Sequence, residues 1–201
     1  MAHLAKVAEL TQKVFNHQSP EEMAELYQEC FWQVDAAALQ AMALAKEPGQ
    51  QELVANVLKI IYSPWLNEVS LNFQQLVKRK GYPGNTEIKE ATATYRVKGM
   101  VVFFVDGLRF DCAKVLERKL TARHLIVDTK TQWSALPSLT DTAKAAVTPV
   151  AALLNGAYDT QDFKPSVVAT GSEFSSYQLK KHWHNRGGNT RKDWILVSLM
   201  A

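Results

Sequence analysis

The sequence predicts an α/β fold class, with a helical region over residues 1–84 followed by a domain built on a parallel sheet over residues 85–201. Two observations lead to this prediction. Apolar residues recur every three or four positions in the first eighty residues, and from Gly99 onward short apolar runs alternate with helical patterns. Strands that alternate with helices are typical of parallel sheets with right-handed crossovers.

The first long helix is predicted to begin at Ser19. Ser19-Pro20-Glu21-Glu22 forms a capping box, with proline at the first helical position and Glu22 reaching back. Pro48-Gly49 is predicted to end this helix. A second helix is expected to carry residues 53–61, and a third to begin at Ser63-Pro64 and end near Gly81.

The second region is predicted to begin with a central strand. Residues 100–105 (MVVFFV) form a continuous apolar run, and Asp106-Gly107 is expected to close it. A helix is predicted from Phe110 to about Leu120, a short strand over 124–127, a helix over 141–154 and one more strand over 193–199. A partner subunit or a second chain could cover the open edge of such a sheet.

Composition limits the function classes. The chain has 201 residues and a formal net charge of +3, which neither predicts nor excludes DNA binding. Its two cysteines form no CxxC pair, so neither a zinc finger nor a redox motif is predicted. The longest apolar run is far shorter than the roughly 20 residues of a membrane span, and we expect a cytoplasmic protein with no membrane partner.

Two groups of residues are candidates for chemistry. Asp106 follows an apolar strand, where ligands of parallel sheets bind, and its carboxylate could hold a metal ion or only cap the next helix. Thr140 follows Pro137 at an expected helix start, where free N–H groups favour phosphate. It is either a metal-activated nucleophile or an ordinary helix cap.

Two other α/β classes fit these residues less well. A haloacid-dehalogenase-type phosphatase needs a second aspartate two positions after the first, but Leu108 stands there. A Rossmann nucleotide binder needs a glycine-rich turn, whereas Gly107 is the only glycine between Asp106 and Asp111. A mononucleotide-binding protein that uses the Asp106-Gly107 turn stays a weaker alternative.

The two groups together resemble the alkaline-phosphatase superfamily, and within it the PglZ proteins of bacterial BREX phage-defence systems. The resemblance lies in residues 102–111 (VFFVDGLRFD), 133–150 (WSALPSLTDTAKAAVTPV) and 162–171 (DFKPSVVATG), and more weakly near residues 62–66. It implies an alkaline-phosphatase-like parallel sheet and a metal-dependent phosphatase or phosphodiesterase that works beside other phage-defence proteins, with nucleic acid among its candidate substrates.

The resemblance also implies roles for single residues. Asp106 would be a zinc ligand, and Thr140 would be both nucleophile and zinc ligand. Arg109 and Asp111 match the motif and would contact phosphate or support the loop as an ion pair, and Lys144 would contact phosphate or be a solvated lysine.

The sequence departs from the family at the remaining metal ligands. Those aspartates and histidines have no counterpart here, so the resemblance implies a partial or truncated copy with an incomplete zinc site, active or inactive by itself. His182 and His184 are expected to diverge on a helix, and Asp128 is a weaker candidate ligand than Asp106. The alternative is a non-catalytic interaction or scaffold module derived from such an enzyme.

Overall fold

The computed structural model describes residues 2–12, 18–84, 102–140, 142–143, 151–156, 164–175, 178 and 194–199. The chain divides into two compact units, Met1–Pro83 and Gly84–Ala201, and the predicted boundary after residue 84 lies next to this division. Both helices and strands are present, as an α/β class requires. Each unit is described by itself.

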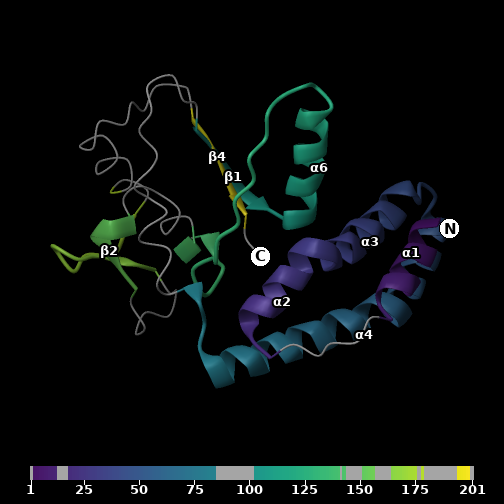
Figure 1. Ribbon diagram of the computed structural model, residues 1–201, viewed down its shortest axis with the longest axis horizontal. Helices are drawn as coiled ribbons and strands as arrows, with labels where there is room; N and C mark the ends of the chain where they lie inside the picture. The colour runs from purple at the N-terminus through teal and green to yellow at the C-terminus, as the bar shows by residue number, and fades with distance from the viewer. Residues whose placement is uncertain are drawn as a thin grey trace. The chain divides into compact units, whose positions relative to one another are not determined.

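The first unit is helical (Figure 1). It consists of α1 (Ala2–Leu10), α2 (Pro20–Leu26), the π-helical turn η1 (Tyr27–Phe31), α3 (Trp32–Leu44) and α4 (Pro48–Lys80). Because α2, η1 and α3 follow one another without a gap, they form one helix with a wide turn inside it. In η1 the N–H of Trp32 reaches the carbonyl of Tyr27, five residues back, which is the hydrogen bond of a π turn.

The start of this helix is confirmed as predicted. Ser19 is the N-cap, its hydroxyl accepts the backbone N–H of Glu22 over 3.2 Å, and Pro20 occupies the first turn. The carboxylate of Glu22 reaches one residue further back than the cap and accepts the N–H of Gln18 over 2.9 Å. Side chains therefore satisfy one backbone donor of the first turn, in Glu22, and one just before the cap, in Gln18.

The predicted break at Ser63-Pro64 is wrong. α4 is 33 residues long and continues through Pro64 without ending there. Pro48 begins this helix, whereas the preceding helix already ends at Leu44. An interior proline removes one backbone hydrogen bond and costs about 3 kcal/mol. Core residues lie on both sides of it, with Leu58 before and Trp65 after. Packing of the two segments against the same core offsets the cost of the proline.

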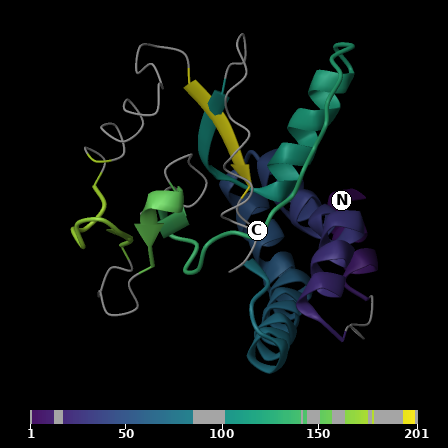
Figure 2. The same ribbon diagram turned by 60° about the vertical axis from the view of Figure 1, so that its left-hand side comes forward.

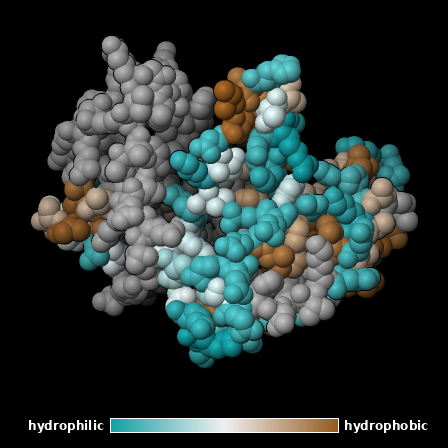
Figure 3. Space-filling model, in the orientation of Figure 1, coloured by the Kyte–Doolittle hydropathy of each residue, from teal (hydrophilic) through white to brown (hydrophobic). Residues whose placement is uncertain are grey.

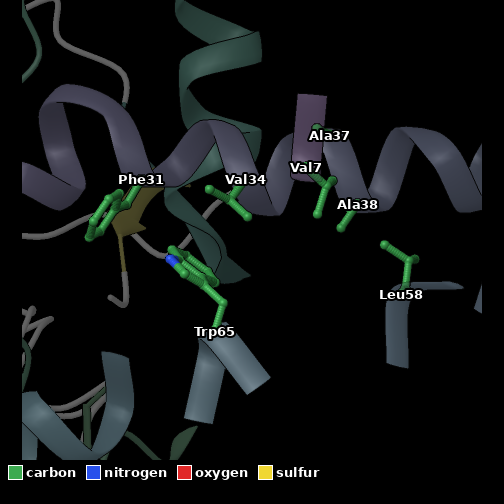
Figure 4. Packing of buried hydrophobic residues seen from close by; sticks show 7 residues of the cluster. All are labelled: Val7, Phe31, Val34, Ala37, Ala38, Leu58 and Trp65. Carbon is green, nitrogen blue, oxygen red and sulfur yellow. The ribbon is translucent and has the colours of Figure 1, made fainter. Parts of the chain in front are cut away.

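The core of the helical unit lies between α1, α3 and α4 and includes the π turn (Figure 4). The rings of Phe31 and Trp65 meet edge to face at 5.4 Å between centroids. Aromatic pairs in this geometry add to the stabilisation from burial. The buried members are Val7, Phe31, Val34, Ala37, Ala38, Leu58 and Trp65.

The second unit contains a parallel strand pair. β1 (Val102–Leu108) pairs with β4 (Trp194–Leu199), and the two run side by side in Figure 2. α6 (Phe110–Thr121) follows β1, as predicted. Farther along, the short 3-10 helix η3 (Ala151–Leu153) leads into β2 (Leu154–Asn155), which pairs antiparallel with β3 (Ser166–Val167).

The predicted strand over 124–127 does not form. α6 ends in a Schellman motif, in which the N–H groups of His124 and Leu125 donate to the carbonyls of Thr121 and Leu120. His124 takes the left-handed position at φ +62°, and Ile126 after it is fully exposed. Residues 124–127 therefore begin inside this helix cap, and none of them pairs with a strand among the described residues.

The predicted helix over 141–154 is also not continuous. Thr140, Thr142 and Ala143 are helical, but residues 151–153 form the 3-10 turn and Leu154 already belongs to β2. Residues 144–150 lie outside the described part of the chain.

None of the described helices is both long enough and apolar enough to span a membrane. On the face shown in Figure 3, most of the coloured residues are hydrophilic, with separate hydrophobic residues among them. The largest exposed apolar fractions belong to Ile126 in the second unit and Ile60 on α4.

Candidate active site

Asp106 and Gly107 lie at an irregularity in β1. Val105 pairs with Val197 and Leu108 with Leu199, so three steps along β1 match two along β4. β1 therefore contains one extra residue here, as in a β-bulge, and the strand continues to Leu108 instead of closing at Asp106 as predicted. Gly107 has φ +65°, a conformation that glycine adopts without strain.

The turn after the bulge is bridged by an ion pair. Nε of Arg109 donates to Oδ1 of Asp111 over 2.9 Å. Asp111 is almost fully buried in the first turn of α6, where a negative charge also interacts favourably with the helix dipole. The side chain of Arg109 is 49% exposed, so its guanidinium holds Asp111 while part of it remains open to solvent.

α6 carries a second ion pair, in which both side chains are partly exposed. Nζ of Lys114 lies 2.7 Å from Oε2 of Glu117 and 5.8 Å from the ring centre of Phe110. The hydrogen bond from Lys114 lowers the pKa of the Glu117 carboxyl below its ordinary value of 4.5, against a smaller opposing effect of burial. Lys114 therefore contacts both Glu117 and the ring of Phe110 at the start of α6.

Thr140 begins a helical turn, as the sequence predicts. The carbonyl of Leu139 accepts the N–H groups of Thr142 and Ala143 over 3.1 and 2.8 Å, so Leu139 occupies the cap and Thr140 the first position. Thr140 and Ser138 are exposed, whereas Ala143 is buried and anchors the turn. Thr140 is therefore accessible to a ligand. The N-cap position is occupied by Leu139 and not by Thr140.

Several predicted site residues lie outside the described part of the chain. These are Lys144, His182 and His184, and the side chain of Asp106, of which only the backbone is described. The separation between the Asp106 and Thr140 oxygens therefore stays a prediction. Asp128 is described: it is exposed and lies 3.7 Å from the equally exposed Lys130.

The described donors do not by themselves fit a zinc site. Protein zinc sites have three or four protein ligands. Among the described residues there is no group of three histidine, cysteine, aspartate or glutamate side chains that could hold a metal ion. Asp106 and Thr140 would supply two donors at most, and a complete site would need ligands in addition to them.

A polar cluster in the helical unit was not predicted. The buried carboxylate of Asp35 accepts the hydroxyl of Tyr27 over 2.6 Å and that of Tyr62 over 2.7 Å. A sequence signal exists, because Asp35 interrupts an apolar stretch of α3 and buried carboxylates need partners. The partners could not be identified in that way, since Tyr62 is 27 positions away on another helix.

Comparisons with known proteins give no relative for this chain. It matches no protein-family model, and neither the curated proteins nor the solved structures compared with it give a significant match.

Proposed function

We propose that this chain carries the Asp106/Thr140 part of a PglZ-type, metal-dependent phosphohydrolase site. It would act in the bacterial cytoplasm beside other components of a BREX-type phage-defence system. The single observation that supports this most is the β-bulge at Asp106-Gly107, because bulges frequently re-aim a side chain beside an active site. The proposed fold around it is an alkaline-phosphatase-like parallel sheet, of which β1 and β4 would be two strands.

Each candidate residue has a role in this proposal. Asp106 would bind zinc, and Thr140 would bind zinc and attack phosphorus. Lys144 would contact phosphate. A bound zinc ion would supply Lewis-acid stabilisation of the phosphate charge and acidify the attacking hydroxyl.

The Arg109–Asp111 pair supports the site in a different way. Asp111 is buried and satisfied by the Arg109 guanidinium, which fixes the chain where β1 passes into α6. The side chain of Arg109 is 49% exposed, so a phosphate oxygen could approach its guanidinium from the solvent side. We infer that Arg109 orients the Asp106 turn and that any contact with substrate is secondary.

A second candidate function is a non-catalytic interaction module. The observation that favours it is the set of large apolar side chains exposed on α4, namely Leu53, Ile60, Leu66 and Leu71. These side chains would mark a protein interaction site if they form one contiguous apolar patch. In this alternative the helical unit binds a partner and the second unit is a scaffold.

Hydrolysis assays separate the two functions. The chain is supplied with Zn²⁺ and tested on p-nitrophenyl phosphate and on bis(p-nitrophenyl) phosphate, which report monoesterase and diesterase activity. Thr140→Ala should abolish hydrolysis and Thr140→Ser should retain part of it, because serine keeps the attacking oxygen. Ser138→Ala is the matched control, since Ser138 is an exposed hydroxyl two positions away. Hydrolysis that survives Thr140→Ala, or its absence from the unmodified chain, would favour the interaction module.

A further inference from the structure

The π turn in the helical unit coincides with the Asp35 cluster. Tyr27 is the first residue of η1, and Asp35 lies four residues after its end. The hydroxyl of Tyr27 and the carboxylate of Asp35 are joined by a 2.6 Å hydrogen bond that spans the whole π turn. Tyr62 holds the other carboxylate oxygen from α4 over 2.7 Å.

Helix geometry connects these two features. An α-helix turns about 100° per residue, so positions eight apart differ by about 80° around its axis, whereas positions seven apart differ by only about 20°. Tyr27 and Asp35 are eight apart, and in a regular α-helix they would not lie on the same line. A π turn has more residues per turn and absorbs one extra residue, which brings the two side chains onto one face.

We propose that Tyr27, Asp35 and Tyr62 form a clamp that holds η1 in its π-helical form and so fixes the rotation of α2 about the helix axis. Phe31, the last residue of η1, packs on Trp65, and Met23 of α2 is also buried. Without the clamp, the helix gains hydrogen bonds by slipping into a regular α register. That slip turns α2 by about one residue, or 100°, and moves Met23 away from the core.

The burial of Asp35 gives the clamp its strength. Asp35 is only 7% exposed, and each of its oxygens accepts one tyrosine hydroxyl. Hydrogen bonds to a charged acceptor are shorter and stronger than neutral ones. Loss of Tyr27 removes the bond that spans η1, and loss of Tyr62 removes the bond that fixes the carboxylate to α4.

The chain contains a natural reporter of this turn. Cys30 lies inside η1 and is partly buried against the core, whereas Cys112 is exposed on α6. In a Cys112→Ser background, Cys30 is the only thiol, because the chain has two cysteines. Its rate of reaction with a thiol reagent therefore measures how often the π turn opens or slips.

The test compares Tyr27→Phe with Leu58→Ala in this background. Leu58→Ala destabilises the same core without touching the clamp, and the two proteins are compared at denaturant concentrations that give equal global stability. The proposal predicts that Cys30 reacts about tenfold faster in Tyr27→Phe, since loss of one charge-assisted hydrogen bond favours opening by about that factor. Equal rates in the two variants would overturn the proposal.

Two single-residue deletions provide an independent test. Deletion of Glu29, an exposed residue of η1, removes the extra residue and places Tyr27 and Asp35 seven apart in a regular α-helix. Deletion of Glu25, equally exposed but in α2, leaves the π turn and rotates the residues before it by about 100°. The first variant should keep a melting temperature close to that of the unmodified chain, and the second should lose several degrees. Equal losses would contradict a register role for η1.

Discussion

Nε of Arg109 lies 2.9 Å from Oδ1 of Asp111, and this contact closes the turn between the β1 bulge and α6. The carboxylate is 3% exposed and the guanidinium side chain 49% exposed, so the pair is buried on one side only. Its main consequence is local rigidity beside Asp106. The contribution of this pair to stability can be compared with that of the highly exposed pair between Lys130 and Asp128.

Removal of the guanidinium should destabilise the second unit. Arg109→Met leaves a buried carboxylate without this donor, and we expect a loss of about 1–2 kcal/mol in the free energy of unfolding. Lys130→Met, the control, should cost less than about 0.5 kcal/mol, because exposed pairs contribute little. Urea unfolding of both variants measures the difference. Equal effects would mean that Arg109 does not stabilise the turn.

The bulge should require glycine at position 107. Gly107→Ala forces a side chain into a left-handed conformation, at a cost of about 1–2 kcal/mol. The cost is conformational, since no atom lies within 4 Å of the added methyl group. Gly49→Ala is the control: this position on α4 is equally open and helical, so alanine should stabilise by up to about 1 kcal/mol. Calorimetric melting of the two variants should show shifts of opposite sign, and a neutral Gly107→Ala would argue against the bulge.

Pro64→Ala should stabilise the helical unit. The substitution restores a backbone donor inside α4 and removes the clash of the proline ring, at a position where the side chain is exposed. The unfolded chain gains some entropy, which offsets part of the effect. We expect a net gain of about 1–2 kcal/mol by urea unfolding, against a gain of only about 0.5 kcal/mol for the neighbouring exposed Ser63→Ala. A loss of stability would show that the core needs the proline.

The Lys114–Glu117 pair predicts a weak pH dependence. Its hydrogen bond lowers the pKa of Glu117 in the folded protein, so the stabilisation is present above the unfolded pKa of about 4.5 and is lost as the pH falls through the folded value. Glu117→Gln should therefore cost less than about 0.5 kcal/mol near pH 7, because the pair lies at the surface and is partly open to solvent. Denaturant titrations of both proteins should converge at acidic pH. A difference in unfolding free energy between the two proteins that grows as the pH falls would contradict this prediction.

Local signals in the sequence were sufficient for several elements. The Ser19 cap, the strand before Asp106, the helix from Phe110 and the strand near residue 195 all form, because capping chemistry and apolar runs act over a few residues. The start of a helical turn at Thr140 was predicted in the same way.

Non-local packing decided the features that the sequence did not reveal. Nothing near Pro64 indicates that core residues on both sides keep α4 continuous. The Schellman motif at His124 lacks the glycine that usually marks such a helix end, so the run after it resembles a strand. The pairing of β1 with β4 joins segments about ninety positions apart in the sequence, and the Asp35–Tyr62 bond joins two helices.

Zinc binding by calorimetric titration tests the central claim most directly, because the account requires Asp106 and Thr140 to share one cation. The unmodified chain should bind Zn²⁺ only weakly, because Asp106 and Thr140 make up part of a site. Asp106→Ala and Thr140→Ala should each weaken binding further, and the double variant should lose less than the sum of the two. Zinc affinity that is unchanged by both substitutions, or losses that simply add, would contradict a shared ion.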